Sequence, residues 1–213
     1  AIESGGNYNT LIGDEAGTAI TTGDNNVVVG YAAGDVMTTG GGNSAIGSGS
    51  LGANTTASNN TAVGASALTA TTTGASNTAV GKSAGAANTT GVALTVVGLS
   101  AGTAHTTGTF NTFLGYESGI TCTTPSYSTG LGAYALRYLQ TGNSNTAVGY
   151  NAMSATTTGA GNVAMGHDAL VANTTGDYNL AIGYAALDAN TTADSNTALG
   201  YAALTANTTG SVL

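Results

Sequence analysis

The sequence of 213 residues is short of charge, aromatic rings, proline and cysteine. Lys and Arg number 2 and Asp and Glu number 10, so charged residues make up 6% of the chain, against roughly a quarter in typical soluble domains. Aromatic residues also make up 6%, with Trp 0 and Phe 2. Because both a charged surface and a bulky core are missing, the composition argues against a conventional enzyme.

These shortages exclude several classes of protein. The basic residues are Lys82 and Arg137 alone, too few to neutralise a phosphate backbone, so we expect no nucleic acid partner. Cys122 has no second cysteine with which to form an intrachain disulfide. No apolar run approaches the roughly 20 residues of a membrane span, so no membrane insertion is expected. Collagen requires far more Pro, and 41% hydrophobic content argues against disorder.

What the sequence does contain is a repeat of 17 residues. A block of the type Asn-x-aliphatic-aliphatic-Gly, whose first residue is numbered position 1, starts at residues 9, 26, 43, 60, 77, 94, 111, 128, 145, 162, 179 and 196, with Leu94 and Ser128 in place of Asn. The twelve repeats carry no insertion, and we assign residues 1–213 to a single repeat domain without evident caps. A fixed period of this kind is typical of stacked, identical structural units.

Two columns of the repeat never vary. Position 5 is always Gly, at Gly13, Gly30, Gly47, Gly64, Gly81, Gly98, Gly115, Gly132, Gly149, Gly166, Gly183 and Gly200. Position 14, the second residue of a Thr-Thr pair, is always Thr, at Thr22, Thr39, Thr56, Thr73, Thr90, Thr107, Thr124, Thr141, Thr158, Thr175, Thr192 and Thr209. We predict that both columns are structural ladders, with Gly where the backbone has positive φ or leaves no room for a Cβ.

The composition of one repeat favours extended structure. Residues 60–64 (NTAVG) suit a strand of about five residues, and the Asn-Thr-Thr segment is interpreted as a second extended segment between turns. Recurrent Gly and β-branched residues disfavour helix. We therefore predict an all-β fold, a parallel β-solenoid or β-roll of twelve 17-residue coils.

Within the strand, two adjacent positions are apolar, as in Ala62 and Val63. Successive side chains in a strand point to opposite faces, so one of the two fills the coil and the other faces outward. A lone chain would then expose a long apolar stripe. We infer that copies of the chain associate side by side as a homo-oligomer.

Blocks such as NSAIG (Asn43 to Gly47), NTAVG (Asn60 to Gly64) and NLAIG (Asn179 to Gly183) resemble the head repeats of trimeric autotransporter adhesins of the YadA type. The segment from Asn196 to Gly210 is similar to repeats of phage tail-fibre proteins. The resemblance covers nearly the whole chain. It implies a left-handed β-roll in a homotrimer that is extracellular, on a cell surface or virion, and that binds a cell-surface glycan or protein receptor.

The sequence indicates no catalytic, cofactor-binding or metal site. His105 and His167 occupy different positions of the repeat, and the ten carboxylates form no continuous column. Ladder-type Ca²⁺ binding is disfavoured because the Gly- and Asp-bearing calcium repeat is absent. We therefore expect neither enzymatic activity nor a cofactor.

A candidate recognition surface lies at position 6, directly after the invariant Gly. Aromatic residues recur there at Tyr31, Tyr116, Tyr150, Tyr184 and Tyr201. One interpretation is a strip of rings that stacks on sugars, and the other, which we favour, is a half-buried packing residue at a turn.

A second candidate surface lies where the repeats depart most from their consensus. It comprises Pro125, Tyr127, Arg137 and Tyr138, which form a candidate irregular contact patch or reflect variation at tolerant turns. The Asn-Thr-Thr sequences at Asn54, Asn88, Asn173, Asn190 and Asn207 match the N-glycosylation pattern, but as members of a repeat column they are interpreted as structural.

The features together predict a non-enzymatic structural subunit of an extracellular attachment fibre, as its head or shaft. One alternative is a subunit that polymerises end to end into a filament, since no capping repeat is evident. Another is an ice-binding β-solenoid that presents its Thr columns, although adjacent Thr residues in a strand face opposite ways.

Overall fold

The computed structural model describes residues 6–211 and shows an all-β parallel β-solenoid of 17-residue coils, which confirms the predicted fold class. The chain divides into two compact units, residues 1–107 and residues 108–213. Each coil contributes one strand of three residues, and turns and bends make up the rest. No helix in the described part is long and apolar enough to cross a membrane.

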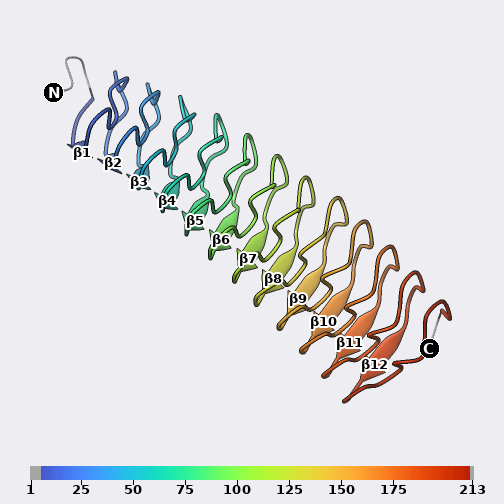
Figure 1. Ribbon diagram of the computed structural model, residues 1–213. Coiled ribbons are helices and arrows are strands. Elements are labelled where there is room, and N and C mark those ends of the chain that lie inside the picture. Colours follow the sequence, from blue (N-terminus) through green and yellow to red (C-terminus); the bar gives the residue numbers. More distant parts are fainter. Residues whose placement is uncertain (1–5, 212–213) are drawn as a thin grey trace. The chain divides into compact units, whose positions relative to one another are not determined.

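Within each unit the strands pair in sequence order (Figure 1). The first unit contains β1 (Thr10–Ile12), β2 (Val27–Val29), β3 (Ser44–Ile46), β4 (Thr61–Val63), β5 (Thr78–Val80) and β6 (Thr95–Val97). The second contains β7 (Thr112–Leu114), β8 (Thr129–Leu131), β9 (Thr146–Val148), β10 (Val163–Met165), β11 (Leu180–Ile182) and β12 (Thr197–Leu199). Register follows the repeat, so that Ala62 pairs with Ala79.

The prediction of two extended segments per coil is wrong. The strand is three residues long rather than about five, and the Asn-Thr-Thr segment forms bends that lie outside any strand. The reason is the local backbone: left-handed residues recur at positions 7, 9 and 17, as at Ser66 (φ 58), Leu68 (φ 49) and Ser76 (φ 59). A residue with positive φ interrupts an extended chain, so only the short stretch before the Gly stays regular.

The interior of each coil is filled by four side-chain columns. In the fourth coil these are Ala62 at position 3, Ala67 at position 8, Leu68 at position 9 and Thr71 at position 12, all fully buried. Positions 3 and 9 trade size from coil to coil. Phe113 is followed six residues later by Gly119, whereas the small Ala62 is followed by Leu68. The two positions therefore compensate for each other in most coils; in the fifth coil both Ala79 and Gly85 are small, and Leu68 and Leu94 lie beside Gly85 instead.

The invariant Gly has two independent structural reasons. Gly64 has φ +136, a conformation that is unfavourable for any residue with a Cβ. A Cβ on Gly64 would also lie 2.5 Å from the carbonyl oxygen of Gly81 in the next coil. The column therefore lies where two backbones of neighbouring coils come closest.

Two side-chain ladders connect the coils. The Asn43 backbone N–H donates to Oδ1 of Asn26, 17 residues earlier, and Asn43 Nδ2 donates to the carbonyl of Ala57, with N–O distances of 2.9 Å for both. At position 13, the Thr38 hydroxyl donates to the Thr55 carbonyl at 3.0 Å. Each ladder satisfies buried polar groups at a turn, which would otherwise destabilise the stack.

Candidate functional surface

An aliphatic column faces outward from the strands at position 4. In the first unit it consists of Ile12, Val29, Ile46, Val63, Val80 and Val97, and in the second of Leu114, Leu131, Val148, Met165, Ile182 and Leu199. Its members are half-buried or exposed, while position 3 on the opposite face of the same strands is almost entirely buried. Each unit thus carries an apolar stripe that its own chain does not cover.

The aromatic column at position 6 forms a ladder of rings in the second unit. The His167 ring stacks between Tyr150 and Tyr184, with centroids 4.9 Å and 5.3 Å away, and Tyr184 stacks on Tyr201 at 5.2 Å. Tyr134, at position 7, makes edge contacts with both Tyr116 and Tyr150. The ladder therefore joins consecutive coils through direct ring contacts, a contribution of about 0.5–1.5 kcal/mol for each pair.

This stacking limits what the ladder can bind. Rings such as Tyr184 have a neighbouring ring on both faces, so the surface shows their edges and hydroxyl groups. Stacking on a sugar needs a free ring face, which makes the packing interpretation of this column the better one. Tyr31 lies in the first unit and is exposed, and its neighbours in the column, Asp14 and Ser48, carry no ring.

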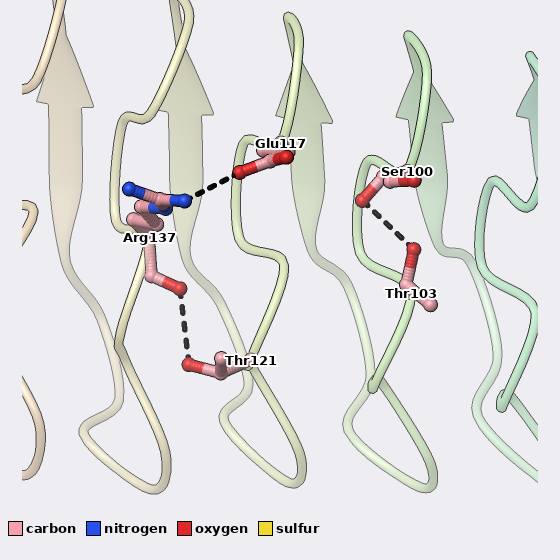
Figure 2. A network of polar contacts seen from close by, with 5 residues as sticks. All are labelled: Ser100, Thr103, Glu117, Thr121 and Arg137. Atoms are coloured by element: carbon pink, nitrogen blue, oxygen red, sulfur yellow. Dashed lines mark hydrogen bonds and ion pairs between the residues drawn. The ribbon is translucent and has the colours of Figure 1, made fainter.

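Arg137 connects two coils of the second unit (Figure 2). Its Nη2 lies 2.7 Å from Oε2 of Glu117, and its backbone carbonyl accepts a hydrogen bond of 3.0 Å from the Thr121 hydroxyl. The guanidinium also lies over the rings of Tyr134 and Tyr138, 4.6 Å and 5.2 Å from their centroids. Among the described residues, the carboxylate that pairs with the Arg137 guanidinium is thus that of Glu117.

Glu117 has a second effect on its surroundings. The pKa of the Tyr116 phenol is raised, first by a hydrogen bond to Glu117 and second by the negative charge of the Glu117 carboxylate.

In the first unit, Figure 2 shows a separate contact in which the Thr103 hydroxyl donates to the Ser100 carbonyl at 2.9 Å. These contacts hold the turns in place, and none of them is a catalytic arrangement.

The four residues of the predicted irregular patch belong to different sets of contacts. Arg137 and Tyr138 lie together, as described above. Pro125 is buried, and its carbonyl accepts a hydrogen bond of 2.6 Å from Nδ2 of Asn111. Tyr127 stacks on Phe110 with a centroid distance of 5.5 Å and an interplanar angle of 9°. Pro125 is therefore part of the stack, whereas Tyr127 belongs to the surface.

The two Thr residues of each pair lie in different surroundings. The hydroxyl of the first, as in Thr157, donates to the carbonyl 17 residues later at 3.1 Å, so this residue forms the ladder. The second, as in Thr158, is exposed in every repeat. The invariant second Thr of each pair therefore forms an exposed column, and the first Thr forms the hydrogen-bonded ladder.

Sequence reasoning named Tyr127 in the irregular patch but did not identify the set of strained aromatic residues at position 17, the turn residue before the strand, which also includes Tyr8 with φ 58. Phe110, Tyr127 and Tyr178 have φ values of 59, 59 and 56, and their exposed fractions are 59%, 62% and 70%. Bulky residues rarely adopt this conformation, which costs about 1–3 kcal/mol. The signal was present in the sequence, since the same column elsewhere holds Ser, Asn, Gly or Ala from residue 25 onward.

The Asn-Thr-Thr sequences place their Asn inside the coil. Asn54, Asn88, Asn173 and Asn190 are buried, and Asn207 is half-buried. Asn54 Nδ2 donates to the Ala57 carbonyl at 3.1 Å, while the Ala57 N–H donates back to Asn54 Oδ1 at 2.9 Å. These side chains close a turn, in agreement with their structural interpretation, and the four buried ones are not accessible to a glycosylating enzyme in the folded chain.

His105 and Cys122 occupy the same buried column as these Asn residues. Burial lowers the pKa of His105 to about 4, and its Nδ1 lies 3.2 Å from Oδ1 of Asn88. Burial raises the pKa of the Cys122 thiol, which keeps it protonated and unreactive. Among residues 6–211, no three His, Cys, Asp or Glu side chains lie close enough together to hold a metal ion.

The burial of His105 predicts a pH dependence of stability. In the unfolded chain this His binds a proton near pH 6.5, but in the folded chain only near pH 4. As the pH falls from 6.5 to 4, the unfolded state therefore takes up the extra proton, and we expect the free energy of unfolding to drop by about 3 kcal/mol.

The variant His105→Asn should lose this part of the pH dependence, because Asn does not titrate, and it should fold, because Asn is native to the same position in five other coils. Urea unfolding of both proteins at pH 7.5, 6, 5 and 4 measures the difference between them. Parallel curves across this range would contradict a buried, neutral His105.

Comparison of the chain with protein-family models, with curated proteins and with solved structures gives no match.

Proposed function

We propose that the chain is a non-enzymatic structural subunit of an extracellular attachment fibre, in which copies associate side by side through the aliphatic column at position 4. The observation that carries this proposal is that column: Val63 and Val80 face outward from adjacent strands, while Ala62 and Ala79 behind them are fully buried. Burial of such a stripe is favourable by about 25 cal/mol for each Å² removed from water.

The partner that fits the stripe best is another copy of the same chain. Its side chains recur once every 17 residues in register, so a surface with the same spacing matches every coil at once. Closed symmetry is the default for such self-association, and we propose three left-handed chains around the stripe, as the resemblance to adhesin heads implies. Ladders of hydrogen bonds in each coil then provide the rigidity that an attachment fibre needs.

The contents of the coils support a mechanical role rather than a chemical one. The interior is filled with Ala, Leu and Asn side chains, and the few ionic contacts are held within the chain. Lys82 and Arg137 are the only sites for trypsin, and Arg137 is held by Glu117. Resistance to such proteases suits exposure outside a cell.

The experiment that tests this proposal is sedimentation equilibrium of the chain and of two paired variants. We expect the unmodified chain to have the mass of three copies, and Val63→Asp with Val80→Asp to shift it to the mass of one, because two carboxylates would be buried in each interface. The matched control, Thr73→Asp with Thr90→Asp, adds the same charge to an exposed column of the same coils.

Circular dichroism of each variant checks that the coils remain folded. A single-copy mass for the unmodified chain at every concentration would overturn the proposed association. Equal dissociation by the control pair would show that charge alone, and not the aliphatic column, controls assembly.

A further inference from the structure

Three aromatic rings, Phe110, Tyr127 and Tyr178, project from the turn that precedes the strand in the second unit. We propose that they form a contact site for a neutral saccharide. The inference rests on the proposed attachment function and identifies the chemical class of its ligand.

The backbone at these three rings is strained. All three residues are held in the left-handed region, where the same turn elsewhere has Ser144 or Ser195. An aromatic residue normally compensates for such strain by burying its ring, but more than half of each of these rings is exposed. These turns therefore carry bulky residues in a strained conformation that are more than half exposed.

The ring faces are the second argument. Phe110 and Tyr127 stack nearly parallel on each other, 5.5 Å apart, so that each has one face covered by the other. The Tyr178 ring lies against the backbone of Gly161, where an added Cβ would come within 2.7 Å of it, and no other ring stacks on it in the described part of the chain. In the ladder at position 6, by contrast, Tyr184 has a ring on both faces. Free faces are what the C–H side of a sugar ring contacts.

The polar surroundings disfavour a ligand with negative charge. Thr124 and Asn143 are exposed in the same turns, and Asn143 Oδ1 accepts a hydrogen bond of 2.8 Å from the Ser126 N–H. Asp177, directly before Tyr178, carries a carboxylate whose Oδ1 accepts a hydrogen bond of 2.7 Å from the Ala160 N–H. The chain has a formal charge of -8, which disfavours anionic polymers, and its Arg137 is already paired with Glu117. Exposed rings beside hydroxyl and amide groups, and beside a carboxylate at Asp177 rather than a cation, match a neutral saccharide better than an anionic one.

The test compares a triple variant with a single matched one. The triple variant is Phe110→Ser, Tyr127→Ser and Tyr178→Ser, which introduces a residue native to the same turn. The control is Tyr184→Ser, which removes a ring from the ladder, where Ser48 shows that Ser is also native. The probes are cellohexaose, maltohexaose and chitohexaose, titrated by calorimetry.

We expect at least one probe to bind the unmodified chain and the Tyr184→Ser variant equally. The triple variant should bind it about a hundred- to a thousandfold more weakly, at about five- to tenfold for each lost ring. Thermal unfolding should show that the triple variant stays folded, because Ser is native to this turn at Ser144 and Ser195 with the same φ, and that Tyr184→Ser loses the stacking of its ladder.

Three results would overturn the inference: no binding of any probe at millimolar concentration, equal loss of binding in Tyr184→Ser, or a changed oligomeric mass for the triple variant. The last would assign the rings to a contact between copies. Failure of the proposed association is a separate result, since it is measured as mass in the absence of saccharide.

Discussion

Replacement of Gly64 by Ala should destabilise the first unit by about 4 kcal/mol or more. Two effects add at this residue. The φ of +136 is unfavourable for any residue with a Cβ, at about 1–3 kcal/mol. The Cβ would also lie 2.5 Å and 2.6 Å from the carbonyl oxygen and carbon of Gly81, and backbone atoms cannot move aside as a flexible side chain can.

Gly200 separates the two effects, because it has a similar φ of +126 but no atom within 4 Å of the position of its Cβ. We expect Gly200→Ala to cost only the conformational part, about 1–3 kcal/mol. Coils of a solenoid unfold in part independently, so amide hydrogen exchange in the strands on either side is the appropriate measurement, with urea unfolding as a second probe. Equal losses for the two variants would contradict the close approach of neighbouring coils.

The second large effect is expected at Phe113 and Gly119. Phe113 is fully buried, and a Cβ on Gly119 would lie 2.8 Å from the Phe113 ring. Phe113→Ala alone leaves a cavity and should lower the free energy of unfolding by about 3–5 kcal/mol. Gly119→Leu alone overfills the coil and should lower it by about 1–3 kcal/mol or more.

The double variant should be much more stable than the sum of the two losses predicts, because it reproduces the pair Ala62 and Leu68 of another coil. The backbone permits the exchange: Gly119 has φ +60, and Leu68 has φ +49 at the same position. A double-mutant cycle from urea unfolding measures the coupling, which we expect to exceed about 2 kcal/mol. Additive losses would show that the two positions do not share one interior volume.

The repeat made much of the fold predictable from the sequence. The 17-residue period and the Gly column located every strand to within two residues, since a fixed period requires each repeat to adopt the same structure. The assignment of Ala62 to the interior and Val63 to the surface required the structure. The exchange of size between Phe113 and Gly119 is visible in the sequence once the columns are compared.

The candidate surface was less predictable, because it depends on backbone conformations that the repeat does not display. The left-handed residues at positions 7, 9 and 17 include Leu68, Tyr127 and Tyr178, residue types that normally avoid such values. The propensity of each residue alone could not identify them; at position 17 only the comparison with Ser, Asn, Gly and Ala in other repeats gives a signal.

Sequence by itself therefore determined the period, the all-β class and the columns that can carry a function. Tertiary structure decided which members of a column face outward and which are committed to the stack. It placed the ladder on the first Thr of each pair and left the second exposed. It also covered both faces of the Tyr184 ring while leaving those of Tyr178 more open. The reason is that these differences arise from contacts between residues 17 positions apart, which act only once the coils have stacked.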